Sequence, residues 1–257
     1  MFKPTFICVH GAWHTSSCWD EVKSLLEAQG YECICPDLPT TNSNPPKDDF
    51  TEDVEMIRST VEKLVNDGKH VILVTHSYSG VPGGQALKGL DKPSCEKRGI
   101  KGGVIRLVYI ASFMVPEGFQ NSTKGTRDGM AESMKTDFQA GIITVGPEDA
   151  KALFYQDIPD ETVAELSKDL KPQSIGCWWS TTNFAAWRYI PTTYVVCTKD
   201  APTTVAAAEF LVRSAQESEN KVDTVIRREV GHSPFFSQPE WTAGMLRQAA
   251  GENLEGI

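Results

Sequence analysis

Short apolar runs alternate with amphipathic stretches along most of the chain, and this alternation constrains the fold more than any other feature. The runs are rich in β-branched residues, and the stretches between them carry apolar residues at helical spacing. Strands that alternate with helices predict an α/β fold, a mostly parallel sheet of about six strands with helices on both faces. The expected strands span residues 5–9, 31–35, 71–75, 104–110, 192–197 and 222–228, and the expected helices span residues 18–29, 51–67, 79–90, 203–216 and 237–249, the last opened by a capping box from Ser237 to Glu240.

The strand rhythm stops between residues 113 and 190, a stretch of about 80 residues, whereas a crossover between parallel strands needs only a dozen or so. This length predicts an insertion. Residues 1–112 and 191–257 are the expected core, and residues 113–190 are the expected helical cap. Within the cap, helices are predicted at residues 147–155, where a proline near the start favours a helix, and at residues 160–170.

The charge balance excludes several kinds of partner. The 25 Lys and Arg residues are outnumbered by 34 Asp and Glu residues, and a net charge of −9 repels phosphate backbones and anionic lipids. Residues 103–115 form the longest apolar run, which Arg106 interrupts and which falls short of the about 20 residues that span a bilayer. The first residues lack a signal peptide's features. We expect a cytoplasmic protein whose partner is a small-molecule substrate, with no nucleic acid and no membrane; a homodimer is compatible with the sequence.

The seven cysteines give no metal or disulfide pattern. Their number is odd, they form no CxxC pair, and no histidine stands at zinc spacing from them. Cys33 and Cys35 share a face of an expected strand, where packing as small apolar side chains is the simpler role. The glycines within residues 80–84 match neither a dinucleotide fingerprint nor a phosphate loop. We therefore expect no metal and no cofactor.

Ser77 stands at the break between an expected buried strand and the helix that follows it. A sharp strand-to-helix turn exposes a serine hydroxyl at a helix N-terminus, and a backbone N–H beside it can bind an oxyanion. The consensus G-x-S-x-G has glycine at both outer positions, whereas this chain has Thr75 and Ser79. An N-cap serine is the alternative role. The context favours Ser77 as a nucleophile.

A serine nucleophile needs a base and an acid that orients the base. His232 follows the last expected strand, and Asp200 follows the strand before it. Both therefore lie at the carboxyl edge of a parallel sheet, where Ser77 also lies, and the order Ser, Asp, His is the one expected of this architecture. The alternatives are a solvated loop histidine and an aspartate that caps a turn.

The turn after the first strand, His10-Gly-Ala-Trp-His14, contains a glycine and leaves backbone N–H groups free to face the serine. The N–H groups of Ala12 and Tyr78 are candidates for an oxyanion hole. His10 is expected to stabilise the turn by a hydrogen bond. His14 is a candidate for the entrance of the site, with a plain surface position as the alternative.

At this point the chain resembles the α/β-hydrolase superfamily, and it is most similar to the small-esterase branch that includes plant methylesterases and hydroxynitrile lyases. The resemblance covers nearly the whole length. It implies the α/β-hydrolase fold, a catalytic triad of Ser77, Asp200 and His232, oxyanion donors at Ala12 and Tyr78, and a cap over the site. The segments that carry it are residues 10–14, 25–31, 36–38 (Pro-Asp-Leu), 76–78 (His-Ser-Tyr), 109–114 (Tyr-Ile-Ala-Ser-Phe-Met) and the turns at Asp200 and His232.

Two departures bear on the reaction. Lyases of this branch carry Thr after the opening His and Lys after the catalytic His, whereas this chain has Gly11 and Ser233. The resemblance therefore favours hydrolysis of a carboxylic ester or lactone over the lyase reaction. The altered elbow leaves a second hypothesis open: a non-hydrolytic relative such as an isomerase, decarboxylase or lyase, or a ligand-binding protein that uses the same pocket.

The substrate is expected to be a hydrophobic small molecule, because the insertion and the segment leading into it are rich in aromatic residues. Most large aromatic side chains pack in cores, but a few should line a mostly apolar pocket. The candidate substrate-binding residues are His14, Phe113, Met114, Trp178 and Trp179.

Overall fold

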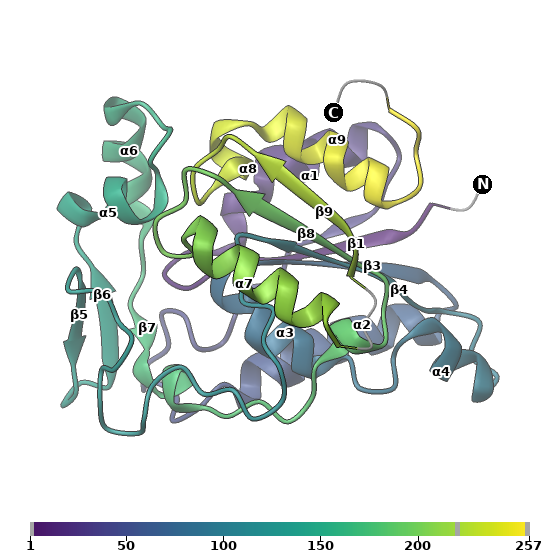
Figure 1. The fold of residues 1–257 in the computed structure, drawn as a ribbon, viewed down its shortest axis with the longest axis horizontal. Helices are drawn as coiled ribbons and strands as arrows, with labels where there is room; N and C mark the ends of the chain where they lie inside the picture. Colours follow the sequence, from purple (N-terminus) through teal and green to yellow (C-terminus); the bar gives the residue numbers. More distant parts are fainter. Residues whose placement is uncertain (1–2, 219–221, 255–257) are drawn as a thin grey trace.

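A six-stranded parallel sheet forms the centre of the protein (Figure 1). The computed structural model describes residues 3–218 and 222–254, and every neighbouring pair in this sheet is parallel, in the order β2-β1-β3-β4-β8-β9. The prediction of an α/β fold with a mostly parallel sheet of about six strands is confirmed. The strands are β1 (Thr5–Val9), β2 (Cys33–Ile34), β3 (His70–His76), β4 (Gly103–Ile110), β8 (Thr192–Cys197) and β9 (Val222–Arg228).

Helices cover both faces of this sheet because alternate residues of each buried strand point to opposite faces. On one face, Ile7 and Leu73 pack in the same apolar cluster as Ile57 of α2. On the other face, Phe6 and Val74 pack in the cluster that holds the apolar residues of α1 and α9. The first face carries α2 (Thr51–Asn66), α3 (Gly80–Ala86) and α7 (Val205–Gln216), and the second carries α1 (Asp20–Ala28), α8 (Pro234–Ser237) and α9 (Pro239–Ala249).

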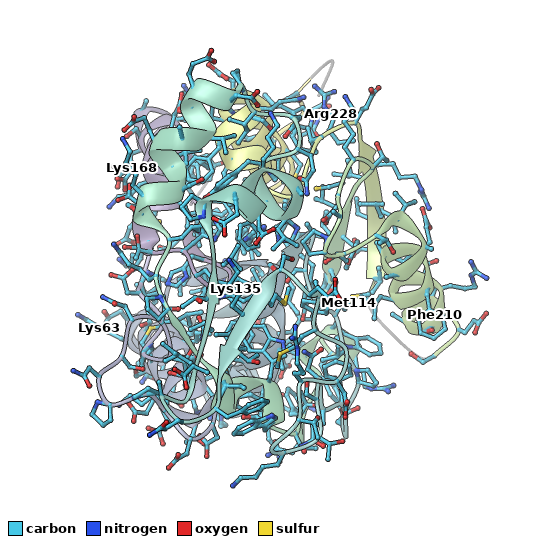
Figure 2. The ribbon with its side chains drawn as sticks, turned by 90° about the vertical axis from the view of Figure 1, so that its left-hand side faces the viewer. Lys63, Met114, Lys135, Lys168, Phe210 and Arg228 are labelled. Atoms are coloured by element: carbon cyan, nitrogen blue, oxygen red, sulfur yellow. The ribbon has the colours of Figure 1, made fainter. Side chains whose placement is uncertain are left out.

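The insertion between β4 and β8 contains a second sheet that the sequence pattern did not predict. Its three antiparallel strands are β5 (Met134–Asp137), β6 (Ile142–Val145) and β7 (Gln173–Ser174). The expected helices are present as α5 (Pro147–Phe154) and α6 (Asp160–Leu166). The cap is thus not purely helical. In Figure 2 the insertion faces the viewer, with Lys135 of β5 near the centre of the picture.

Several boundaries differ from the sequence prediction for local reasons. The capping box at Ser237 is wrong: Ser237 ends α8, and Gln238 precedes α9 without a side-chain cap. The strand expected at residues 31–35 is reduced to Cys33–Ile34, which pairs with Phe6 and Ile7. An additional short helix, α4 (Lys92–Lys97), begins after Asp91, whose carboxylate accepts the Ser94 N–H at 2.9 Å. Over residues 3–218 and 222–254, no helix is long and apolar enough to cross a membrane.

Candidate active site

The turn after β3 holds Ser77 in a left-handed backbone conformation. Its φ is +52°, a region that costs an L-residue other than glycine about 1–2 kcal/mol. A 3₁₀ turn over Ser77–Ser79 follows directly and leads into α3. Strand, strained serine and helix are the elements of a nucleophile elbow.

Neighbouring residues compensate for the two glycines that the elbow lacks. A Cβ atom on Gly83 of α3 would lie 2.8 Å from the Thr75 methyl group, so glycine at 83 leaves room for threonine at 75. The Ser79 hydroxyl accepts the His76 N–H at 2.9 Å and lies 3.0 Å from the Val9 carbonyl oxygen. Thr75 and Ser79 therefore fit this turn without displacing the strand or the helix.

Asp200 and His232 form a hydrogen-bonded pair at the carboxyl edge of the sheet. The Nδ1–H of His232 donates to Asp200 Oδ1 at 2.9 Å, and each side chain is only 1% exposed. The Thr203 N–H also donates to Asp200 Oδ1, and the His232 N–H donates to Gln156 Oε1 from the insertion at 2.8 Å. With its proton held on Nδ1, the imidazole leaves Nε2 free to accept a proton.

His76, the residue before Ser77, contacts His232. The His76 Nε2–H donates to the carbonyl oxygen of His232 at 2.9 Å, and the centroids of the two rings are 4.6 Å apart. No direct hydrogen bond joins the Ser77 hydroxyl to the His232 ring among the described residues. Such a bond often tightens only when substrate binds. Burial lowers the pKa of His76 well below its usual range and that of His14 to about 4, so neither adds a positive charge beside His232 near neutral pH.

The first turn approaches the elbow so closely that only glycine fits at position 11. A Cβ atom there would lie 2.8 Å from His76 Nδ1 and 3.0 Å from Ser77 Cβ. The Ala12 N–H enters no hydrogen bond within residues 3–218 and 222–254, and Tyr78 is the second residue of the 3₁₀ turn, where backbone N–H groups have no partner inside the turn. The expected structural role of His10 is confirmed, since its Nδ1–H donates to the Gly11 carbonyl and its Nε2 accepts the Leu38 N–H.

A small apolar cavity of about 30 Å³ lies beside Tyr78, with room for one or two water molecules. The Tyr78 ring stacks on Trp178, with centroids 5.5 Å apart and planes 6° apart. Of the predicted substrate-binding residues, Phe113 and Trp178 line this cavity. Its lining residues are Tyr78, Val81, Phe113, Phe119, Asn121, Cys177, Trp178 and Ser180.

The other three predicted substrate-binding residues lie elsewhere. Met114 is buried in the core and is not among the residues that line this cavity. Trp179 stacks on Phe138 and donates its indole N–H to the Thr126 carbonyl. His14 is buried rather than solvated. It hydrogen-bonds the Ala12 carbonyl and the Tyr155 hydroxyl, and it lines a separate cavity of about 190 Å³ between the core and the insertion.

The buried carboxylate of Asp53 is the main feature of this region that the sequence prediction missed. Its oxygens accept hydrogen bonds from the Tyr78 hydroxyl at 2.7 Å, the Thr40 hydroxyl at 2.6 Å and the Thr40 N–H at 2.9 Å. Burial raises the pKa of Asp53 to about 6, and these donors limit the rise. The available signal was its spacing: Asp53 stands four and eight residues before Ile57 and Val61, on the apolar stripe of α2.

Comparison with known proteins identifies the family of this chain. Residues 6–245 match the alpha/beta hydrolase family. The chain belongs to that family. An alpha/beta hydrolase of Aspergillus novofumigatus, nvfD, is 31% identical over 257 residues, which cover 99% of this chain and 100% of that protein. Methylesterase 7 of Arabidopsis thaliana is 25% identical over 262 residues, with 95% of each chain covered.

A solved structure shares this fold. The crystal structure of polyneuridine aldehyde esterase superposes with a TM-score of 0.73 at 22% identity, covering 97% of this chain and all of that one. The resemblance to the small-esterase branch is therefore confirmed. The methylesterase among the relatives of this chain supports ester hydrolysis as the general type of reaction.

Proposed function

We propose that this hydrolase cleaves a carboxylic ester or lactone of a hydrophobic small molecule, with Ser77 as nucleophile, His232 as general base and Asp200 as the acid that orients it. The observation that carries the proposal is the buried 2.9 Å hydrogen bond between His232 Nδ1 and Asp200 Oδ1, in which His232 also contacts His76, the residue before a serine with a positive φ. A buried, oriented imidazole next to a strained serine is the arrangement that nucleophilic catalysis needs.

The reaction follows from these positions. His232 Nε2 takes the hydroxyl proton as Ser77 Oγ attacks the ester carbonyl, and Asp200 stabilises the imidazolium that forms. The N–H groups of Ala12 and Tyr78 stabilise the oxyanion. The imidazolium returns its proton to the leaving alcohol, which leaves an acyl group on Ser77. Water, activated by the same imidazole, releases the acid.

The close packing of Gly11 supports hydrolysis over the lyase reaction. A side chain at this position would collide with His76, so the threonine that lyases of this branch carry there has no space in this chain. Ser233, in place of a lysine, provides no cation beside His232. The mostly apolar lining of the cavity at Tyr78 supports a hydrophobic substrate. At about 30 Å³ the cavity must widen to admit an aromatic group.

Labelling with a fluorophosphonate tests the proposal, because this reagent reacts with an activated serine. We expect one label on the wild-type protein, at Ser77 by mass spectrometry, and none on Ser77→Ala. The matched control is Ser79→Ala, which removes a hydroxyl from the same turn and should retain the label. An unlabelled, folded wild-type protein would point to a non-hydrolytic or ligand-binding relative instead.

A further inference from the structure

Three cysteine side chains meet between β1 and β2, on the face of the sheet covered by α1. Cys8 Sγ lies 3.8 Å from Cys33 Sγ, and Cys33 Sγ lies 3.9 Å from Cys35 Sγ. All three sulfur atoms lie within 4.8 Å of one another. The parallel register that pairs Ile7 with Ile34 brings them together. The sequence pattern could relate only Cys33 and Cys35, because Cys8 lies 25 residues before Cys33.

These separations suit a single metal ion bound by three thiolates. Metal–thiolate bonds are about 2.3 Å long, so three sulfur atoms in a plane around one ion stand about 4 Å apart. We propose that Cys8, Cys33 and Cys35 form a binding site for one soft, monovalent d¹⁰ cation, copper(I), separate from the hydrolase site. Thiolates select copper(I) and zinc over harder ions.

The number of available ligands favours copper(I) over zinc. Structural zinc is bound by four ligands in a tetrahedron, whereas copper(I) is stable with three thiolates in a plane. His10 lies nearby, but both of its ring nitrogens are used, by the Gly11 carbonyl and the Leu38 N–H. Within the described residues, the metal-ligating group here consists of the three cysteines alone.

The surroundings allow a cation to enter and bind. Cys8 and Cys33 are buried, and Cys35 is partly exposed, so Cys35 is the point of access. Glu27 adds negative potential near Cys33, and Lys23 adds positive potential near Cys35. Binding replaces the S–H protons of the three thiols, which pass to solvent, and copper stays copper(I).

Anaerobic titration of the reduced protein with copper(I), against the chelator bathocuproine disulfonate, tests the site. We expect one equivalent to be retained, with X-ray absorption showing three sulfur neighbours at about 2.3 Å. Cys35→Ser, at the partly exposed position, should lower the affinity about 10-fold or more and leave two sulfur neighbours. Cys95→Ser is the matched control, because Cys95 is buried in α4 outside the cluster, and it should bind copper(I) like the wild type.

Cys8→Ala provides a second variant, and circular dichroism reports whether it folds. Equal retention of copper(I) by the wild type and Cys35→Ser would overturn the proposal and leave close packing of three thiols as the role of the cluster. Two sulfur neighbours in the wild type would also overturn it. Fluorophosphonate labelling of Ser77 is measured on the same samples, so failure at one site is distinguishable from failure at the other.

Discussion

Two regions flank the Ser77 turn, and they are built in different ways. On one side, Asp200 and His232 follow β8 and β9 directly, and a hydrogen bond of 2.9 Å joins them. On the other side, Asp53 of α2 accepts hydrogen bonds from Tyr78 and Thr40, and the Tyr78 ring stacks on Trp178 of the insertion. We refer to these regions as the acid–base side and the stacked side.

The difference shows two ways in which this fold positions the residues around Ser77. The acid–base side depends on strand ends, which a parallel sheet gathers at one edge whatever the intervening sequence. The stacked side depends on contacts among a loop, a helix, the elbow and the insertion. The Gln173 side chain of β7 joins it by donating to the Thr40 hydroxyl at 2.7 Å. We expect the acid–base side to govern turnover and the stacked side to govern stability and substrate choice.

Removal of the proposed nucleophile or of the proposed base should have the largest effect on turnover. Ser77→Ala and His232→Ala should each lower kcat by about 10⁴-fold or more, because members of a triad act as a unit. Turnover of an ester that the wild type hydrolyses is the measurement, with circular dichroism to verify folding. Retention of a tenth of the wild-type rate in either folded variant would remove the proposed mechanism and the distinction between the two sides.

The stacked side should make the stability of the protein depend on pH through Asp53. The folded-state pKa of Asp53, about 6, exceeds its ordinary value of about 3.9. The folded state therefore binds the Asp53 proton more tightly than the unfolded state does. The stability that this proton adds is fully present below the unfolded-state pKa of about 3.9 and is lost as the pH rises through 6. Asp53→Asn removes this dependence. Between pH 4 and 7, the wild type should lose about 2 kcal/mol of unfolding free energy relative to Asp53→Asn.

Urea unfolding at several pH values measures this difference. Glu55→Gln, an exposed carboxylate on the same helix, is the control and should leave the pH dependence unchanged. A constant difference between wild type and Asp53→Asn across this range would show that the carboxylate titrates as it does in the unfolded chain.

Substrate choice should depend on the aromatic lining next to Tyr78. We expect kcat/KM for an aromatic ester to exceed that for a charged ester of similar size by about 10- to 100-fold, because burial of one apolar group is worth roughly 1.5–3 kcal/mol. Phe113→Ala should reduce this preference, since Phe113 lines the cavity. Met114→Leu, in the adjacent core position, is the control. A preference for the charged ester would place the substrate outside this cavity.

The smallest effect is expected at the turn itself. Ser79→Gly restores the family's small residue but removes the hydroxyl that bonds the His76 N–H and lies near the Val9 carbonyl. The unfolding free energy should fall by about 1 kcal/mol, with kcat within about threefold of the wild type. Thermal unfolding and ester turnover measure the two quantities. A loss of kcat as large as that of Ser77→Ala would mean that Ser79 helps to hold the nucleophile.

The sequence predicted the core elements well because their signals are local. The bounds of β1, β8 and β9 agree with the prediction, and α2 and α7 differ from it by one or two residues. The strands of the insertion were missed because β7 has only two residues and β5 and β6 have four each, too few for a periodic pattern. The prediction of a capping box at Ser237 was wrong because Ser237 is the last residue of α8 and does not precede α9 as its N-cap.

The candidate site likewise has features that follow from local sequence signals and features that do not. The sequence by itself determined the order of strands and helices along the chain, and therefore that Ser77, Asp200 and His232 all follow strands at the carboxyl edge of the sheet, because topology brings the carboxyl ends of parallel strands together. Only the tertiary structure decided which aromatic residues line the cavity, how Asp53 reaches Tyr78, and that Cys8 meets Cys33 and Cys35. These contacts join segments distant in sequence, and they depend on packing and register, which no local pattern of residues encodes.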